Sequence, residues 1–275
     1  NSSSNWMSSY TNPKILSAKD GPFGWNESVN SEFNSVENIK IDSKKSGLMR
    51  KEGFGSVVSH NMDGILRGTG VYITLADEKE QTIVLKEKSS NHFSFRKGST
   101  SQNYPNSLMG SVALLKQSIY DSRWYKDNNE INNEVNLSLE AINKNIGLPN
   151  IIEVRDKLRV LLAQKVGKEL NINFIIKGNG DEYQRINEIK KQYTNLIVPI
   201  NFPKAYNVDD PFKNNNLTLG QLKHWEMAPS NLYFLEKNDI NFSITTHGLK
   251  NISEFRNNLI KSIEREQVRK IFLKL

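Results

Sequence analysis

The feature that most constrains the fold is a threefold alternation of short apolar runs with helical patterns between residues 148 and 203. The apolar runs are rich in β-branched residues, and each is too short to form a globular helix: residues 150–154, 172–176 and 196–200. Such runs are typical of strands buried on both faces of a parallel sheet. Asp156 and Asp181 stand where an N-cap side chain would begin a helix. This order predicts an α/β protein with right-handed crossovers in a parallel sheet or barrel.

The polar residues that follow these runs are the first candidates for a binding site, because ligands of parallel sheets bind at the carboxyl ends of the strands. They lie at Glu153 and Arg155, at Lys177 to Gly180 and at Asn201 to Lys204. Lys177 and Glu153 end neighbouring strands, so we expect them to form an ion pair. Such a pair is retained for structure as easily as for chemistry.

Charge and composition exclude several classes of function. The net charge is +7, from 37 basic and 30 acidic residues, but the basic residues alternate with acidic and amide residues along the chain. This mixing favours a solvated surface, and no nucleic-acid partner is expected. No apolar run approaches the roughly 20 residues that span a bilayer, so no membrane span is expected either. The chain contains no cysteine, which rules out thiolate ligands and thiol nucleophiles within it.

The chain divides into two expected regions. Residues 1–48 are polar and weakly periodic, and we interpret them as an irregular excursion, whereas residues 49–275 form one large β/α domain. Within this domain, residues 71–76 and 82–86 predict a hairpin. Residues from Leu108 to Ile119 follow helical spacing and predict a long helix. The asparagine-rich residues 127–136 and the stretch 201–217 are expected to be irregular.

A set of motifs spread along the chain supports a more specific interpretation. The motifs are Gly53-Phe54-Gly55, His60, Asp63-Gly64, Arg67-Gly68-Thr69-Gly70 and residues 102–110, followed by residues 180–186, 200–203 and 245–247. Together they resemble the amidohydrolase-related proteins of Bacteroidetes, relatives of imidazolonepropionase, over most of residues 20–264. The resemblance implies a distorted TIM (β/α)8 barrel of the amidohydrolase type. Here the first strand and the flanking β-sandwich are not recognisable.

The resemblance also implies a chemistry, the hydrolysis of C–N bonds with one or two divalent metals at the carboxyl ends of the strands. The family's ligands are a His-x-His pair on the first strand, single histidines on the fifth and sixth, and an aspartate on the eighth. This chain departs from the pattern, since the corresponding positions hold Glu153, Gly178 and His247. We therefore expect no cofactor in this segment. Zinc or another divalent metal is expected only if the segment is an enzyme.

Two functions from different classes follow from the resemblance. In the first, the segment is a non-catalytic barrel that serves as a scaffold for a covalently linked second amidohydrolase half. In the second, it belongs to an active metal-dependent amidohydrolase whose His-x-His strand lies outside this chain. The resemblance further implies that the chain is the N-terminal half of a longer, periplasmic or secreted protein. A barrel that lacks a strand exposes sheet edges, so either residues outside this chain supply the missing strand or the chain forms a homo-oligomer.

Individual residues carry alternative interpretations. His60 and Asp63 follow a predicted strand and represent either a catalytic base with its orienting carboxylate or a hydrogen-bonded loop pair. The segment from Gly178 through Asn179 to Gly180 is either an anion site at a helix N-terminus or a simple strand-to-helix turn. His247 is a candidate cleft residue or a structural histidine. Arg67, Lys177, Asn179 and Asn201 complete the candidate substrate-binding residues.

Overall fold

The computed structural model describes residues 19–80, 82–128, 135–206 and 217–266. These ranges contain a seven-stranded sheet in which the strands are neighbours in chain order. The strands are β1 (Ser56–Ser59), β2 (Leu66–Thr74), β3 (Val84–Ser94), β4 (Asn150–Glu153), β5 (Phe174–Lys177), β6 (Leu196–Pro199) and β7 (Phe242–Thr245). The strands from β3 to β7 are parallel, whereas β1 and β2 pair in antiparallel fashion.

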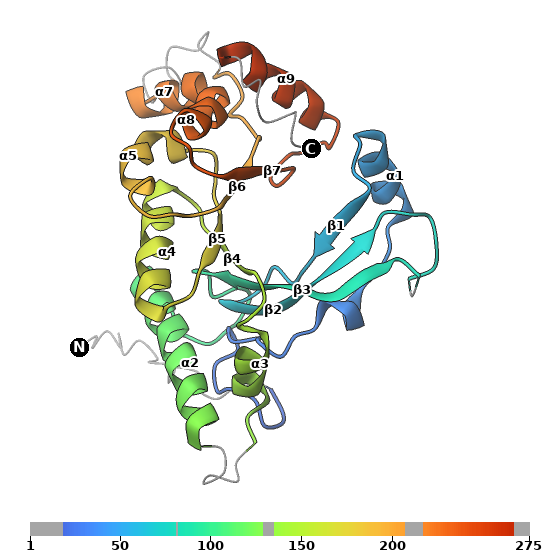
Figure 1. The fold of residues 1–275 in the computed structure, drawn as a ribbon, viewed down its shortest axis with the longest axis vertical. Coiled ribbons are helices and arrows are strands. Elements are labelled where there is room, and N and C mark those ends of the chain that lie inside the picture. The colour runs from blue at the N-terminus through green and yellow to red at the C-terminus, as the bar shows by residue number, and fades with distance from the viewer. Residues whose placement is uncertain (1–18, 81, 129–134, 207–216, 267–275) are drawn as a thin grey trace, which may run out of the picture.

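The helices gather mainly on one side of this sheet. They are α1 (Ser43–Lys51), α2 (Leu108–Asn128), α3 (Leu137–Asn145), α4 (Lys157–Leu170), α5 (Ile186–Ile189), α7 (Leu219–Met227), α8 (Asn231–Lys237) and α9 (Glu254–Glu266). Three 3-10 helices add to them: η1 (Ser35–Asn38), η2 (Glu182–Arg185) and η3 (Ala228–Ser230). Figure 1 shows α2, α4 and α5 along one side, while β1 to β3 extend away on the other.

The two faces of the parallel strands differ in burial. On the face toward the helices, Ile152, Ile176 and Val198 are completely buried. On the opposite face, Ile151, Ile175 and Ile197 are only partly buried. In-register pairing of parallel strands places these two sets on opposite faces, because successive side chains alternate. We call the first the outer face and the second the inner face of a half-barrel.

The three predicted strands and the first predicted helix are confirmed. The apolar runs form β4, β5 and β6, and α4 follows β4 with the Asp156 side chain accepting a hydrogen bond from the Arg159 amide. The expectation for Asp181 was wrong, because its side chain makes no capping hydrogen bond and a 3-10 turn follows it instead of an α-helix. The carboxylate of Asp181 lies instead 3.4 Å from the ammonium of Lys157.

The barrel is more open than the sequence predicted. The expectation was an eight-stranded barrel lacking its first strand, but five parallel strands are joined to an antiparallel arm of β1 and β2. The predicted hairpin is present and is longer than expected, since β3 continues to Ser94. Beyond the arm, Phe54 packs edge-on against Phe255 of α9, with ring centroids 5.0 Å apart. This contact connects the arm to the last helix.

The first residues of the described chain belong to the same core as the barrel. Val29 is buried and pairs with Leu66 in an isolated parallel bridge. Asn34 forms a similar bridge with Thr69, and the Ser31 hydroxyl donates to the Ser138 carbonyl. The expected boundary at residue 48 falls inside α1. Residues 1–18 of the expected excursion lie outside the described residues, as do parts of the two expected irregular stretches, residues 129–134 and 207–216.

Candidate functional site

Polar side chains from several elements meet at the carboxyl end of the inner face. Ser94, Glu153 and Lys177 are register partners at the ends of β3, β4 and β5. His247 lies just beyond β7 and contacts Lys177. Glu153, Lys177 and His247 lie near three further side chains. We call the whole group the rim cluster: His60, Arg67, His92, Glu153, Lys177 and His247. Sequence reasoning had identified all of these residues except His92.

A β-bulge in β2 places Arg67 in this cluster. Leu66 pairs with Phe93 and Gly68 with His92, which leaves Arg67 as an additional residue between two paired ones. Bulges next to functional sites often redirect a side chain in this way. Gly68 is needed at the bulge because its φ is +76° and a Cβ there would lie 2.1 Å from the Phe33 carbonyl oxygen. The glycine of this motif is therefore structural, and it allows the arginine to reach the inner face.

One carboxylate oxygen of Glu153 contacts two cationic side chains. Its Oε2 lies 3.1 Å from Nη1 of Arg67 and 3.3 Å from Nζ of Lys177. The side chain of Arg67 is 1% exposed, and that of Glu153 is 10% exposed. Burial by itself raises the pKa of the Glu153 carboxyl, but the charges of Lys177 and Arg67 outweigh it and hold this pKa below its usual range. The predicted ion pair of Glu153 and Lys177 is confirmed.

Lys177 also contacts the imidazole of His247. The distance from Nζ to Nδ1 is 3.0 Å. Burial lowers the pKa of His247, and the Lys177 charge lowers it further, so the ring is neutral. An ammonium group can only donate, so Nδ1 accepts and Nε2 carries the proton. The Nε2–H group of His247 is therefore a free donor within the described residues.

Two stacked histidines lie on the side of the cluster toward the arm. The rings of His60 and His92 are 3.7 Å apart at their centroids and nearly parallel. His92 is almost completely buried, and its Nε2 lies 2.8 Å from the Ser90 hydroxyl. Gly70 makes room for this ring, because a Cβ at that position would lie 2.6 Å from His92 Nε2. Burial lowers the pKa of His60 to about 4 and also lowers that of His92.

The expected pairing of His60 with Asp63 is not formed. Nδ1 of His60 donates to the carbonyl of Asn61 at 2.7 Å. The carboxylate of Asp63 instead accepts from the amide and the hydroxyl of Ser99, at 2.7 and 2.6 Å. Asp63 organises the loop after β3, and the interpretation as an orienting carboxylate is wrong.

The turn after β5 is occupied by the chain's own carboxylate. Oε1 of Glu182 accepts hydrogen bonds from the amides of Asn179 and Gly180, at 2.9 and 3.2 Å, and Oε2 accepts from Asn231. A Cβ on Gly178 would lie 1.9 Å from Oε1, so the glycine is required by this close approach. Glu182 is fully buried, and burial raises its pKa. The alternative of an external anion bound at this turn is therefore wrong.

The remaining two candidate substrate-binding side chains lie at the solvent-exposed margin. Asn179 is exposed, although its backbone amide is engaged with Glu182. Asn201 is exposed as well, and its amide packs against Gly248, the residue that follows His247. Gly248 has a φ of +80°, and a Cβ there would lie 2.1 Å from Asn201 Nδ2. Asn201 thus lies beside the rim cluster, whereas the side chain of Asn179 is exposed to solvent.

The donors of the rim cluster do not fit a divalent metal. A divalent site needs several deprotonated N or O donors directed at one point. Glu153 is the carboxylate of the cluster and already neutralises Arg67 and Lys177, while His60 and His92 stack in parallel and do not converge. Within the described ranges, no group of three or more His, Cys, Asp or Glu side chains is arranged to hold a metal ion. Two adjacent cations would also repel one.

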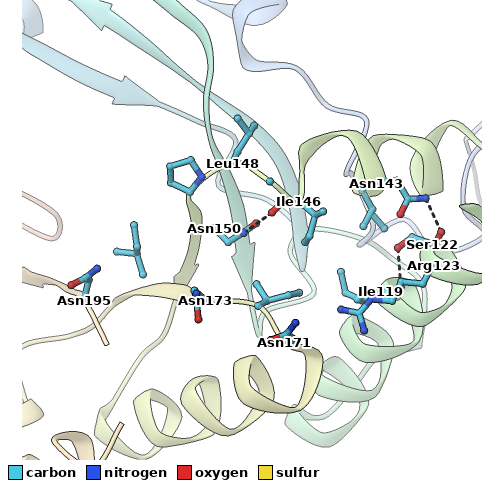
Figure 2. A pocket seen from close by; sticks show the side chains of 15 residues that line it. Ile119, Ser122, Arg123, Asn143, Ile146, Leu148, Asn150, Asn171, Asn173 and Asn195 are labelled. Carbon is cyan, nitrogen blue, oxygen red and sulfur yellow. Dashed lines mark hydrogen bonds between the residues drawn. The ribbon is translucent and has the colours of Figure 1, made fainter. Parts of the chain in front are cut away.

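A cavity lies at the opposite end of the strands. It has a volume of about 620 Å³, and its lining includes Asn150, Asn173 and Asn195 at or just before the starts of β4, β5 and β6 (Figure 2). Arg123 and Asn143 also line it, but each donates to a backbone carbonyl. The amino ends of barrel strands generally serve stability. We therefore place the candidate site at the rim cluster.

Comparisons with known proteins support the architecture. No family model matches the sequence, and no curated protein matches it. Among solved structures, an amidohydrolase from Thermotoga maritima MSB8 is similar, with a TM-score of 0.67 and 13% sequence identity. The two chains are therefore similar in fold. The likeness covers 88% of this chain and 64% of that protein. At this identity it concerns the fold, and the chain spans less than two thirds of the neighbour's length.

Within the described segments, no helix combines the length and the apolar character required to cross a bilayer.

Proposed function

We propose that this segment is a metal-free amidohydrolase-like barrel domain that is non-catalytic by itself. In this proposal it serves as a scaffold or interaction domain for a covalently linked second half that carries the hydrolysis of C–N bonds. The fold likeness supports the barrel, and the composition of the rim cluster supports the loss of metal chemistry. The resemblance to Bacteroidetes amidohydrolases supports the linked half and a periplasmic or secreted location. Fractionation of the native cells would test that location.

The observation that carries the proposal is the position of two cations on Glu153. In the family pattern the fifth and sixth strands present metal ligands at this end of the barrel. Here Lys177 and Arg67 lie 3.3 and 3.1 Å from the same carboxylate oxygen. An ammonium and a guanidinium in this place supply positive charge without an open coordination position. They satisfy the carboxylate in the way that a metal ion would otherwise do.

The second candidate is an active metal-dependent amidohydrolase whose His-x-His strand comes from outside this chain. The shorter length of this chain relative to its structural neighbour favours it, because the chain covers 64% of that protein. In this case zinc or another divalent metal would depend mostly on ligands supplied from elsewhere. Glu153 and His247 would then have to exchange their present partners, Arg67 and Lys177, for the metal.

Elemental analysis tests whether this chain holds a metal ion by itself. The purified chain is incubated with excess zinc, desalted and analysed for zinc, manganese, iron and nickel. We expect less than about a tenth of an ion per chain. About one tightly held divalent ion per chain would overturn the proposal and favour the enzyme. Glu153→Gln provides the matched control, because any metal retained by the variant does not depend on the Glu153 carboxylate.

A further inference from the structure

The rim cluster carries an excess of one positive charge. Arg67 and Lys177 are cations and Glu153 is an anion, while His60, His92 and His247 are neutral because burial lowers each pKa. Two further charged residues, Arg96 and Asp63, act on Arg67 with opposite sign. A half-buried group of this kind attracts one negative charge.

The hydrogen-bond inventory of the cluster also has an excess of donors. Arg67 uses Nε on the Gly64 carbonyl and Nη1 on Glu153, which leaves three of its five N–H groups without a partner among the described residues. Lys177 has one ammonium proton left after Glu153 and His247, and His247 has its Nε2–H. The acceptors left over are Glu153 Oε1 and His60 Nε2, and Nδ1 of His92 is either a donor or an acceptor, depending on the tautomer. Donors are in the majority.

The elements that hold these donors are fixed. Arg67 comes from a bulge that Gly68 makes possible, Lys177 ends a parallel strand, and His247 is positioned by its contact with Lys177. Charge-assisted donors that are held in place by the fold lose little conformational freedom when they bind an acceptor. The inner face beyond them is only partly buried, so a small ligand can approach from the open side of the half-barrel.

We propose that the rim cluster is a binding site for a small carboxylate monoanion, held by Lys177, the Nε2–H of His247 and the outer guanidinium nitrogen of Arg67. This rests on the proposed function, because a metal-free rim leaves these donors available. A carboxylate carries the one negative charge that balances the excess. Its two oxygens can accept hydrogen bonds from donors on different side chains. Inorganic phosphate carries a second charge near neutral pH, and the cluster has no cation to balance it.

The test titrates the chain with sodium acetate after passage through a chelating resin. Thermal unfolding and the imidazole nitrogen resonances are followed, with sodium chloride at equal ionic strength as the reference. We expect saturable binding with a dissociation constant on the order of 1 mM. We also expect a shift of the His247 resonances but not of those of His224, which contacts Tyr183 away from the cluster. The chain has four histidines, so assignment by single substitutions is direct.

Variants show whether the effect arises at the site. Lys177→Met is expected to weaken acetate binding at least tenfold, whereas Lys157→Met, which removes a lysine paired with Asp181, leaves it unchanged. His247→Gln retains a donor near Nε2 and is expected to bind within threefold of the wild type, whereas His247→Leu is expected to lose binding. If Lys177→Met unfolds, the His247 pair provides the same test.

Several results would overturn the carboxylate site. One is an acetate effect that rises linearly with concentration, and another is one that persists unchanged in Lys177→Met or His247→Leu. Tighter binding of inorganic phosphate than of acetate would overturn the assignment of the ligand class. The metal content of the same resin-treated sample is measured separately. A metal-containing protein refutes the proposed function, whereas a metal-free protein without saturable acetate binding refutes only this inference.

Discussion

The outer and inner faces of the same five parallel strands differ in burial and in composition. The outer face is apolar and covered by helices, so that Ile152, Ile176 and Val198 are fully buried. The inner face has partly buried isoleucines along its length and a charged network at its carboxyl end. The comparison shows that stability is concentrated on the outer face. The inner face contains the groups whose chemistry is unusual, and it is the face that a partner or ligand can reach.

The largest expected effect comes from the charge network. Glu153→Gln leaves the largely buried side chains of Arg67 and Lys177 without a counter-charge. We expect the free energy of unfolding to fall by about 3–5 kcal/mol, the usual cost of breaking a buried ion pair. Urea denaturation measures it. Glu169→Gln removes an exposed partner of Lys116 and is expected to cost less than about 1 kcal/mol. Equal losses in the two variants would contradict the network's burial.

The two faces are compared directly by substituting neighbouring residues of β5. Ile176→Ala on the outer face creates a cavity in the core and is expected to cost about 2–5 kcal/mol. Ile175→Ala on the inner face removes the same atoms from a partly solvated place and is expected to cost about 1 kcal/mol. Both values come from the same denaturation experiment. If Ile175→Ala cost as much as Ile176→Ala, the inner face would be as well packed as the outer one.

Acidification tests the neutral histidines of the inner face. The pKa of His60 is lowered by burial to about 4, against an ordinary value of 6.5. The unfolded chain therefore binds more protons between these values, and stability falls as the pH falls from about 6.5 to about 4. The upper bound is on the order of 3 kcal/mol. Buried Glu182 has the opposite effect on stability. Burial raises its pKa, so its contribution to stability increases as the pH falls.

The matched variant for this pH dependence is His60→Phe. Phenylalanine keeps a ring against His92 but does not titrate in this range. We expect the variant to lose less stability than the wild type between pH 6.5 and pH 4.5, as measured by urea denaturation at each pH. An identical pH profile for the two proteins would show that His60 is not neutral and buried in the folded state.

The smallest expected effect on stability comes from Ile197→Ser on the inner face. We expect a change within about 1 kcal/mol, because this side chain is only partly buried. We expect the isolated chain to self-associate through its uncovered inner face and the substitution to weaken that association. Size-exclusion chromatography with light scattering measures it. A wild-type protein that elutes as a monomer of 31.5 kDa would contradict this expectation.

The sequence was sufficient for the parts of the fold that depend on local pattern. Apolar runs and helical spacing predicted β4, β5 and β6 and the helix after Asp156, because burial on both faces dictates composition. The ion pair of Lys177 with Glu153 was predictable too, since the ends of adjacent parallel strands are neighbours in space. The position of Arg67 beside Glu153 could not be predicted. It depends on a β-bulge in β2, which is defined only by the pairing of β2 with β3.

Two residues of the site were missed although a signal was present. His92 lies in a segment where Ser90, His92 and Ser94 alternate with Asn91, Phe93 and Phe95, a period of two that marks a strand with one polar face. The expected hairpin ended before this segment. Glu182 was missed because Gly178 was interpreted as a vacant ligand position. A glycine four residues before a buried acid also indicates a close approach, and here the structure shows that approach.

The bulge at Arg67 has a consequence for how this strand can change. Since one additional residue separates the pairs of Leu66 and Gly68, the alternation of inward and outward side chains reverses there. A deletion of one residue at this point would remove this irregularity from the pairing with β3, yet it would leave Glu153 with Lys177 as its remaining cation. Length variation in β2 is therefore a route, besides substitution of Arg67 or Lys177, by which this half-barrel would lose its charge excess.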